Sequence, residues 1–127
     1  MQDIVAKLDA LLPSVRERRQ EIEEARRIPA DLADALHRTG VFSLPVPKAV
    51  GGIESPPADT MRIIETVSAA DGSTGWTVMI GMGIFAGLIN EVGAKEVYVD
   101  PTAPVAGVAG PIGQAVRVDG GVRVTGR

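Results

Sequence analysis

The sequence predicts a mainly α-helical fold, an amino-terminal helical bundle followed by the first strands of an incomplete β domain. Apolar residues recur every three or four positions through most of residues 1–100, which is the period of helices with one buried face. Glycine and proline then divide residues 101–127 into short segments rich in valine, as expected of strands and turns. The 127 residues, 45% of them hydrophobic, can bury a core. We therefore expect a helical domain over 1–100 and the start of a β domain, truncated in this chain, over 101–127.

Two or three helices are expected in the first forty residues. Apolar side chains spaced by three and four predict a helix over Asp3–Leu12. Because proline suits a first helical turn, Ser14–Arg27 is either a second helix that starts after Pro13 or a kinked continuation of the first. Pro29 opens the next helix, and Gly40 ends it.

The middle of the chain is predicted to form an extended segment, a turn and a further helix. Apolar residues and prolines alternate over Phe42–Pro47, which predicts an extended path, and Gly51-Gly52 allows a turn. Pro56-Pro57 begins a helix. The residues expected to share the apolar face of that helix are Met61, Ile64, Val67 and Ser68, with Ile63 flanking it.

Residues 72–90 carry no charge at all. The run invites a transmembrane interpretation, but acidic residues flank it, no basic anchors follow it, and polar and small residues dilute it. We expect a buried bundle helix, in which Gly83 and Gly87 let a neighbouring helix approach closely. Further on, Ala115–Val118 and Val122–Thr125 predict a β-hairpin around Asp119-Gly120-Gly121. Since an isolated hairpin is marginal in water, it should need further strands.

The composition excludes several classes of function. A net charge of −3 gives no general attraction to nucleic acid or to anionic lipid. The arginines between residues 16 and 27 lie among glutamates, which is typical of a solvated, salt-bridged helix face. Without cysteine there is no disulfide, thiolate nucleophile or sulfur-ligated metal. The start of the chain lacks the pattern of a secretory signal, so we expect a cytoplasmic protein that binds neither nucleic acid nor membrane.

No catalytic constellation and no metal site emerge from the residues themselves. His37 is the only histidine, and it lies near the end of a predicted helix, where a cation interacts favourably with the helix dipole. We interpret it as a surface cap rather than a base or a metal ligand.

One motif supports an alternative, a small dinucleotide-binding domain. Gly81, Gly83 and Ala86 match the G-x-G-x-x-A pattern, the strand-like Trp76–Ile80 precedes it, and Asp100 follows about twenty residues later. Against this alternative, the motif comes after a long helical pattern, and one βαβ unit would have no neighbouring strands.

Three blocks of sequence resemble the acyl-CoA dehydrogenase superfamily. Residues 27–54 contain R-x-P, a short helix, glycine before a hydrophobic residue, and P-x-x-x-G-G, the order found in the amino-terminal domain of that superfamily. Ala69–Trp76 resembles the A-x-D-x-S-x-x-W that starts a bundle helix in its flavin-dependent monooxygenase branch. Residues 107–127 look like the beginning of its middle β domain.

The resemblance implies an oxidoreductase with a flavin, FMN or FAD, in the complete protein. The flavin would contact the loop formed by Val108, Ala109, Gly110, Pro111 and Gly113. The substrate, an aromatic compound or an acyl thioester, would meet Trp76, Met79 and Gly83. The resemblance also implies a homo-oligomer and, in the monooxygenase branch, a separate flavin reductase.

Members of the superfamily are much longer than this chain, and their catalytic base lies in the part that follows. We therefore expect the chain alone to bind flavin weakly and to be inactive. A different hypothesis remains open, that of a stand-alone helical interaction module whose uncharged helix over 72–90 meets a partner.

Overall fold

The computed structural model describes residues 1–83, 90–107, 110 and 113–126. Over these residues the elements are α1 (Gln2–Glu17), α2 (Arg19–Ala25), α3 (Ala30–Thr39), the 3₁₀ turns η1 (Val41–Ser43) and η2 (Lys48–Val50), α4 (Pro57–Ala70), α5 (Gly72–Gly81), α6 (Glu91–Val97), β1 (Gln114–Val118) and β2 (Gly121–Thr125). The predicted order, helices first and a pair of strands last, is confirmed. None of the helices in this described part combines the length and the apolar character needed to span a bilayer.

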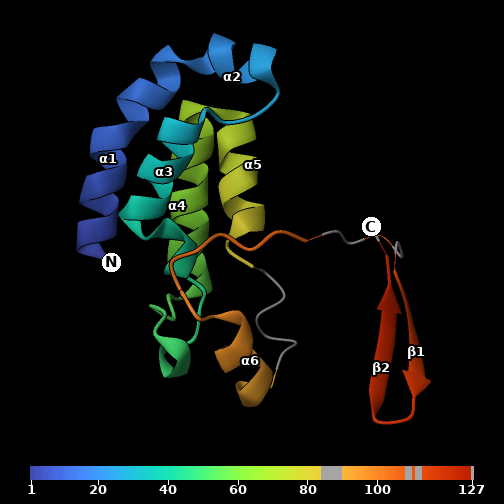
Figure 1. Ribbon diagram of the computed structural model, residues 1–127. Helices are drawn as coiled ribbons and strands as arrows, with labels where there is room; N and C mark the ends of the chain where they lie inside the picture. Colours follow the sequence, from blue (N-terminus) through green and yellow to red (C-terminus); the bar gives the residue numbers. More distant parts are fainter. Residues whose placement is uncertain (84–89, 108–109, 111–112, 127) are drawn as a thin grey trace.

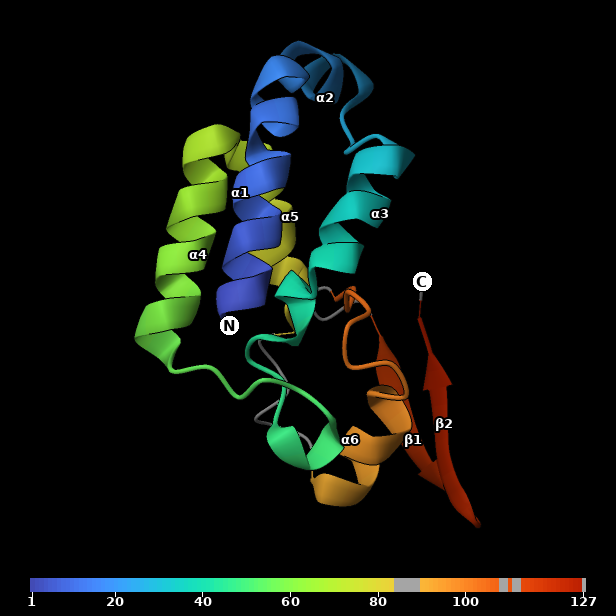
Figure 2. The ribbon, with the colours of Figure 1, turned by 90° about the vertical axis from the view of Figure 1, so that its left-hand side faces the viewer.

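The helices α1, α3, α4 and α5 lie side by side as a bundle, α2 crosses one end, and α6 lies beyond the other end (Figures 1 and 2). The core lies where the apolar stripes of these helices meet, because each stripe repeats every three or four residues. The buried side chains of this core are Ile4, Leu8, Leu12, Val15, Ile22, Leu32, Leu36, Val41, Phe42, Leu44, Ile63, Val67, Ala70, Val78 and Met82. Burying a side chain of this size contributes about 1.5–3 kcal/mol.

Helix α1 runs through Pro13 without ending there. The proline ring is exposed on the outer side of the helix, and the helical pattern resumes with a bond from the Arg18 N–H to the Ser14 carbonyl, 3.2 Å. The break between α1 and α2 comes instead at Arg18, whose φ and ψ are −100° and 15°. Of the two alternatives that the sequence left open, the continuation through Pro13 is observed, but it extends only to Glu17, and Arg19–Ala25 form a separate helix.

The prediction of an extended path over Phe42–Pro47 is wrong. The segment is bent, and it turns through η1 with short-range bonds from Ser43 N–H to the Gly40 carbonyl and from Leu44 N–H to the Val41 carbonyl, 3.0 and 3.3 Å. Proline fixes φ near −65° but leaves ψ open, so it fits a turn as well as an extended chain. Gly51, with φ of 88°, makes the predicted turn.

The segment that follows this turn folds back on η1 and the residues after it. The N–H groups of Ile53, Glu54 and Ser55 donate to the carbonyls of Ser43, Val46 and Leu44, at 3.0, 2.9 and 2.7 Å. A Cβ at Gly52 would lie 2.0 Å from the Val46 carbonyl oxygen. The absence of a side chain at Gly52 therefore lets the two backbone segments touch.

The buried face of α4 is shifted from the one predicted but shares Val67 with it. Ile63 and Val67 enter the core, Ile64 packs against it partly buried, and Met61 is 58% exposed. Apolar residues stand on both sides of this helix, so the sequence pattern did not identify the buried one. Helix α5 packs closely on α4, since a Cβ at Gly75 would lie 2.0 Å from the Ser68 hydroxyl oxygen.

The prediction of one helix over 72–90 is also wrong, because α5 ends at Gly81. Gly83 follows with φ of 64°, in the left-handed region that ends helices. Gly83 therefore does not serve, as predicted, to let a neighbouring helix approach α5. Gly87 lies outside the described residues.

Strands β1 and β2 form an antiparallel pair in which Val118 is opposite Gly121. The two-residue turn is Asp119-Gly120, and the positive φ falls on Gly120, at 77°. Every residue of both strands is exposed, and Figure 1 shows the hairpin standing apart from the bundle. Both faces carry valine, which leaves apolar surface uncovered on each side.

Candidate functional site

Helix α5 carries Trp76, the most exposed large apolar side chain described in the four bundle helices. Helix α5 begins at Asp71, whose Oδ2 accepts hydrogen bonds from the Thr74 N–H and the Ser73 hydroxyl, both 2.7 Å. This is the capping that aspartate before a helix is suited to make. It fixes the start of α5 and so places Trp76, which is 65% exposed, on the outer side.

Beside Trp76 lies an uncharged hollow of about 350 Å³. One wall is α5, and the other is the return segment, which we define as residues 100–107. The return segment is held against α5 by a hydrogen bond from the Val105 N–H to the Gly81 carbonyl, 2.8 Å. The lining residues are Trp76, Thr77, Ile80, Gly81, Pro104, Val105 and Ala106. Such a lining suits a flat, apolar molecule.

Met79 lines a second hollow, of about 390 Å³, on the α4 side of α5. Its neighbours there include Met61, Ile64 and Met82. Methionine side chains adapt to irregular apolar shapes. Trp76 and Met79, two of the predicted substrate-contacting residues, therefore line separate hollows.

Gly83, the third predicted substrate-contacting residue, is buried behind the return segment. A Cβ there would lie 3.1 Å from the Tyr98 hydroxyl oxygen and 3.3 Å from Val105. Gly83 therefore lies next to the return segment, and residues of the same segment line the hollow beside Trp76. Burial raises the pKa of Tyr98.

The residues predicted to contact flavin lie between the return segment and β1. Val108, Ala109 and Pro111 lie outside the described residues, while Gly110 and Gly113 are exposed. With no side chain at either glycine, a planar ring can approach the backbone. The exposure of these two glycines is compatible with the predicted contact to flavin, which stays a prediction.

The dinucleotide-binding alternative fails on secondary structure. That motif requires a strand before its glycines, but Trp76–Ile80 lies inside helix α5, and Gly81 is the last residue of the helix. Ala86 lies outside the described residues. Asp100, the acidic residue that would bind the ribose in such a domain, instead accepts a hydrogen bond from the Thr102 N–H at 2.9 Å.

Two arginines of the cluster, Arg18 and Arg19, make structural contacts, and those of Arg18 are the ion pairs that the sequence predicted for this face. Arg18 binds Glu21 at 2.6 Å and Asp31 at 2.5 Å. Its hydrogen bonds to Glu21 and Asp31 raise the pKa of Arg18 and lower those of both carboxylates. Arg19 donates to the carbonyls of Ala69 and Ala70 at the end of α4.

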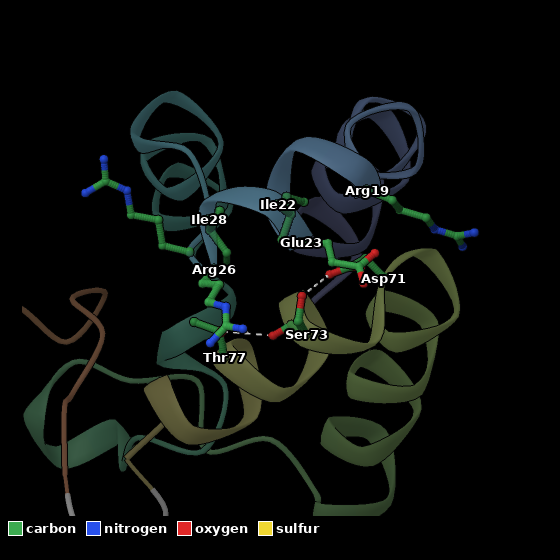
Figure 3. A pocket seen from close by; sticks show the side chains of 9 residues that line it. Arg19, Ile22, Glu23, Arg26, Ile28, Asp71, Ser73 and Thr77 are labelled. Carbon is green, nitrogen blue, oxygen red and sulfur yellow. Dashed lines mark hydrogen bonds between the residues drawn. The ribbon is translucent and has the colours of Figure 1, made fainter.

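A polar hollow of about 510 Å³ lies between this cluster and the start of α5 (Figure 3). Figure 3 shows Asp71 turned toward Ser73, and the Arg26 side chain reaching toward Thr77. The Thr77 hydroxyl donates to the Ser73 carbonyl, 2.9 Å. The lining carries charges of both signs, with Glu23 and Asp71 among the arginines, so we assign this hollow no ligand.

Sequence reasoning missed the connection between α3 and the return segment. The His37 Nε2 lies 3.0 Å from the Thr102 Oγ1 and 3.7 Å from the Asp100 Oδ2. His37 is therefore half-buried against the return segment, and it does more than cap the end of α3 at the surface. The one local signal was the Asp100-Pro101-Thr102 sequence, which favours a turn held by the aspartate side chain.

Comparison with known proteins gives consistent results. The family model for the amino-terminal domain of acyl-CoA dehydrogenase matches residues 9–99. The oxygenase subunit HsaA of a flavin-dependent monooxygenase from Rhodococcus jostii is 37% identical over 94% of this chain and 32% of its own length. The indole-3-acetate monooxygenase of Acinetobacter baumannii is 38% identical over 99% of this chain and 33% of its own length.

Solved structures show the same likeness. The crystal structure of 3-HSA hydroxylase from Rhodococcus sp. RHA1 superposes with a TM-score of 0.86 at 34% identity, covering 98% of this chain and 34% of that one. The HsaA monooxygenase of M. tuberculosis gives a TM-score of 0.86 at 34% identity, covering 98% of this chain and 35% of that one. This chain therefore spans about a third of the length of these relatives and corresponds to their amino-terminal part.

The resemblance drawn from the three sequence blocks is confirmed by these matches. The family model covers most of the chain and includes α3, the turn at Gly51, and α5 with Trp76. The chain belongs to the family of acyl-CoA dehydrogenase amino-terminal domains.

Proposed function

We propose that this chain is the amino-terminal helical part of the oxygenase component of a two-component, flavin-dependent monooxygenase that acts on an aromatic compound. The observation that carries the proposal is the match to flavin-dependent monooxygenases along nearly the whole chain, with the same fold. Within it, residues 1–100 form the helical domain, and residues 101–127 begin a β domain. The last helix ending at Val97 and the first strand beginning at Gln114 support this division.

In this proposal the outward face of α5 forms one wall of the substrate pocket. Trp76 and Met79 contact the substrate from the two hollows, and Gly83 leaves room for the return segment behind. The exposure of Trp76 and the uncharged lining of its hollow support this role. An aromatic ring stacked on Trp76 would gain about 0.5–1.5 kcal/mol beyond its buried area.

The cofactor in this proposal is a flavin, FMN or FAD, next to the loop formed by Val108, Ala109, Gly110, Pro111 and Gly113. Reduced flavin supplies the electrons for oxygen chemistry when it is bound. The chain's own residues line the pocket and exclude water from it. A separate reductase delivers the reduced flavin, and the oxygenase is a homo-oligomer. The names of the relatives, which are oxygenase subunits or components, support the reductase.

The test is an assay of the full polypeptide that carries this chain. With a flavin reductase, NADH and oxygen, it should hydroxylate phenolic or indolic substrates, and the 127-residue chain alone should not. Trp76→Leu should raise the KM for the aromatic substrate, whereas Val5→Ala on α1 should leave it unchanged.

Two results would contradict the proposal. One is oxidation of an acyl thioester without any hydroxylation by the full polypeptide, which would place it with the dehydrogenases. The other is a 127-residue chain that is a stable monomer and captures a protein partner through α5, which would favour the stand-alone interaction module.

A further inference from the structure

The return segment is attached to the bundle at two points. After α6 it crosses the end of the bundle at which α3 and α5 end (orange in Figure 1). The Val105 N–H bonds to the Gly81 carbonyl on α5, 2.8 Å. The second attachment is His37 on α3, which reaches Thr102. Between these points lies Pro104, part of the wall of the hollow beside Trp76.

The turn that His37 contacts is already held in shape by its own hydrogen bonds. The Asp100 Oδ1 accepts from the Thr102 N–H at 2.9 Å and from the Thr102 Oγ1 at 2.6 Å. The Ala103 N–H donates to the Asp100 carbonyl at 3.1 Å. A contact from α3 to the Thr102 hydroxyl therefore fixes the whole turn, not one side chain.

His37 is well placed to make that contact. It lies in the last turn of α3, a helix whose buried Leu32 and Leu36 anchor it in the core. Gly40, in the left-handed conformation with φ of 80°, ends the helix just beyond it. The ring is half-buried, and its Nε2 lies 3.0 Å from the Thr102 Oγ1. The contact links residues that are 65 positions apart in the chain.

We infer that His37 is a positioning residue, which holds the return segment against the end of the bundle and so sets the wall formed by Pro104, Val105 and Ala106 beside Trp76. The inference that this wall affects substrate binding rests on the proposed function. The attachment itself does not, because it is a property of the chain without flavin or substrate.

A carboxylate also faces His37 across this contact. Asp100 lies on the return segment, with its Oδ2 3.7 Å from the His37 Nε2. Hydrogen bonds from the side chain and backbone of Thr102 lower the pKa of Asp100, so this carboxylate keeps its negative charge below the ordinary range of pH.

The sharpest readout is the hydrogen-exchange protection of the Val105 amide, measured by NMR on the chain and corrected for the intrinsic exchange rate. Loss of one hydrogen bond in His37→Ala should lower this protection about fivefold. Thr102→Val should do the same. His37→Gln, which puts an amide nitrogen near the position of Nε2, should restore the protection seen in the unmodified chain. Arg62→Ala, which breaks an exposed pair on α4, serves as the matched control and should change nothing.

The protection of a second amide separates positioning from general stability. The Met82 amide, bonded to the Val78 carbonyl at 3.1 Å inside the bundle, reports whether each variant stays folded. Unchanged Val105 protection in both His37→Ala and Thr102→Val, with Met82 still protected, would overturn the inference.

A second measurement tests the link to substrate binding in the full polypeptide. His37→Ala should raise KM about fivefold and leave kcat nearly unchanged, and His37→Gln should restore KM. If Val105 protection falls while KM stays constant, the attachment stands and the proposed pocket is wrong. If hydroxylation proceeds and Val105 protection does not respond, the proposed function stands and the role of His37 is wrong.

Discussion

The tight contact between α4 and α5 predicts a large difference between two chemically identical substitutions in α5. In Gly75→Ala, the new Cβ would lie 2.0 Å from the Ser68 Oγ and 2.7 Å from the Ser68 Cα. Carbon atoms in contact sit about 3.5–4.0 Å apart. The hydroxyl can rotate away, but the backbone Cα cannot, so the helices must separate. In Gly72→Ala, at the first residue of the same helix, the new Cβ meets nothing within 4 Å.

The expected magnitudes follow from these distances. Overpacking costs about 1–3 kcal/mol, and alanine in place of glycine returns up to about 1 kcal/mol of helix propensity. Gly75→Ala should therefore lose about 1–2 kcal/mol of unfolding free energy. Gly72→Ala should gain up to about 1 kcal/mol. The two variants should differ by about 2 kcal/mol.

Urea unfolding followed by far-ultraviolet circular dichroism measures this difference. With a slope of about 2 kcal/mol per molar urea, the two midpoints should lie about 1 M apart. Ser68→Gly removes the Oγ and the Cβ but keeps the Cα, so the double variant with Gly75→Ala should recover part of the loss. Equal midpoints for Gly75→Ala and Gly72→Ala would refute the close packing of α4 on α5.

Three further substitutions test the core, the cap of α5 and the turn after η2 by the same unfolding measurement. Leu36→Ala, at a side chain 1% exposed, should cost about 2–5 kcal/mol, while Val5→Ala, at one 38% exposed, should cost less than about 0.5 kcal/mol; similar losses would contradict the assigned core. Asp71→Ala should cost about 1 kcal/mol by removing the cap. Burial acts to raise the pKa of Asp71, but hydrogen bonds from the start of α5 outweigh it and lower the pKa. This stabilisation is complete above about pH 4 and is lost as the pH falls through the lowered pKa of Asp71. An acid titration in which Asp71→Asn and the unmodified chain lose stability over the same pH range would contradict this role of the Asp71 charge. Gly52→Ala, with its Cβ 2.0 Å from the Val46 carbonyl oxygen, should cost at least about 1–3 kcal/mol, and an unchanged midpoint would refute the backbone contact.

The helix starts could be predicted because their signals are local. Pro29, Pro57 and Asp71 each stand where a helix begins, and Gly40 stands where one ends. Proline fits a first helical turn, and aspartate accepts hydrogen bonds from free N–H groups, whatever the rest of the chain does. The hairpin turn at Gly120 is local in the same sense.

The features that were missed depend on contacts between distant residues. The bend after Phe42 is fixed by bonds such as that from the Ile53 N–H to the Ser43 carbonyl, which proline spacing does not encode. Helix α5 ends at Gly81 inside an uncharged run, so hydrophobicity gave no stop signal. In the candidate site, Trp76 could be predicted because it ends a sequence motif. The wall opposite Trp76 depends on the contact between the return segment and Gly81, which no local sequence pattern predicts.

The segment from Val41 to Ser55 has a consequence for proteolysis. A protease must draw several residues of extended chain into its cleft, and segments without regular helix or strand are usually the ones it cuts. Here the backbone is bonded to itself from Ser43 to Ser55, and Val41, Leu44 and Val46 are buried. This irregular stretch should therefore resist nicking as long as the bundle stays folded, and cleavage within it would report global unfolding rather than local opening.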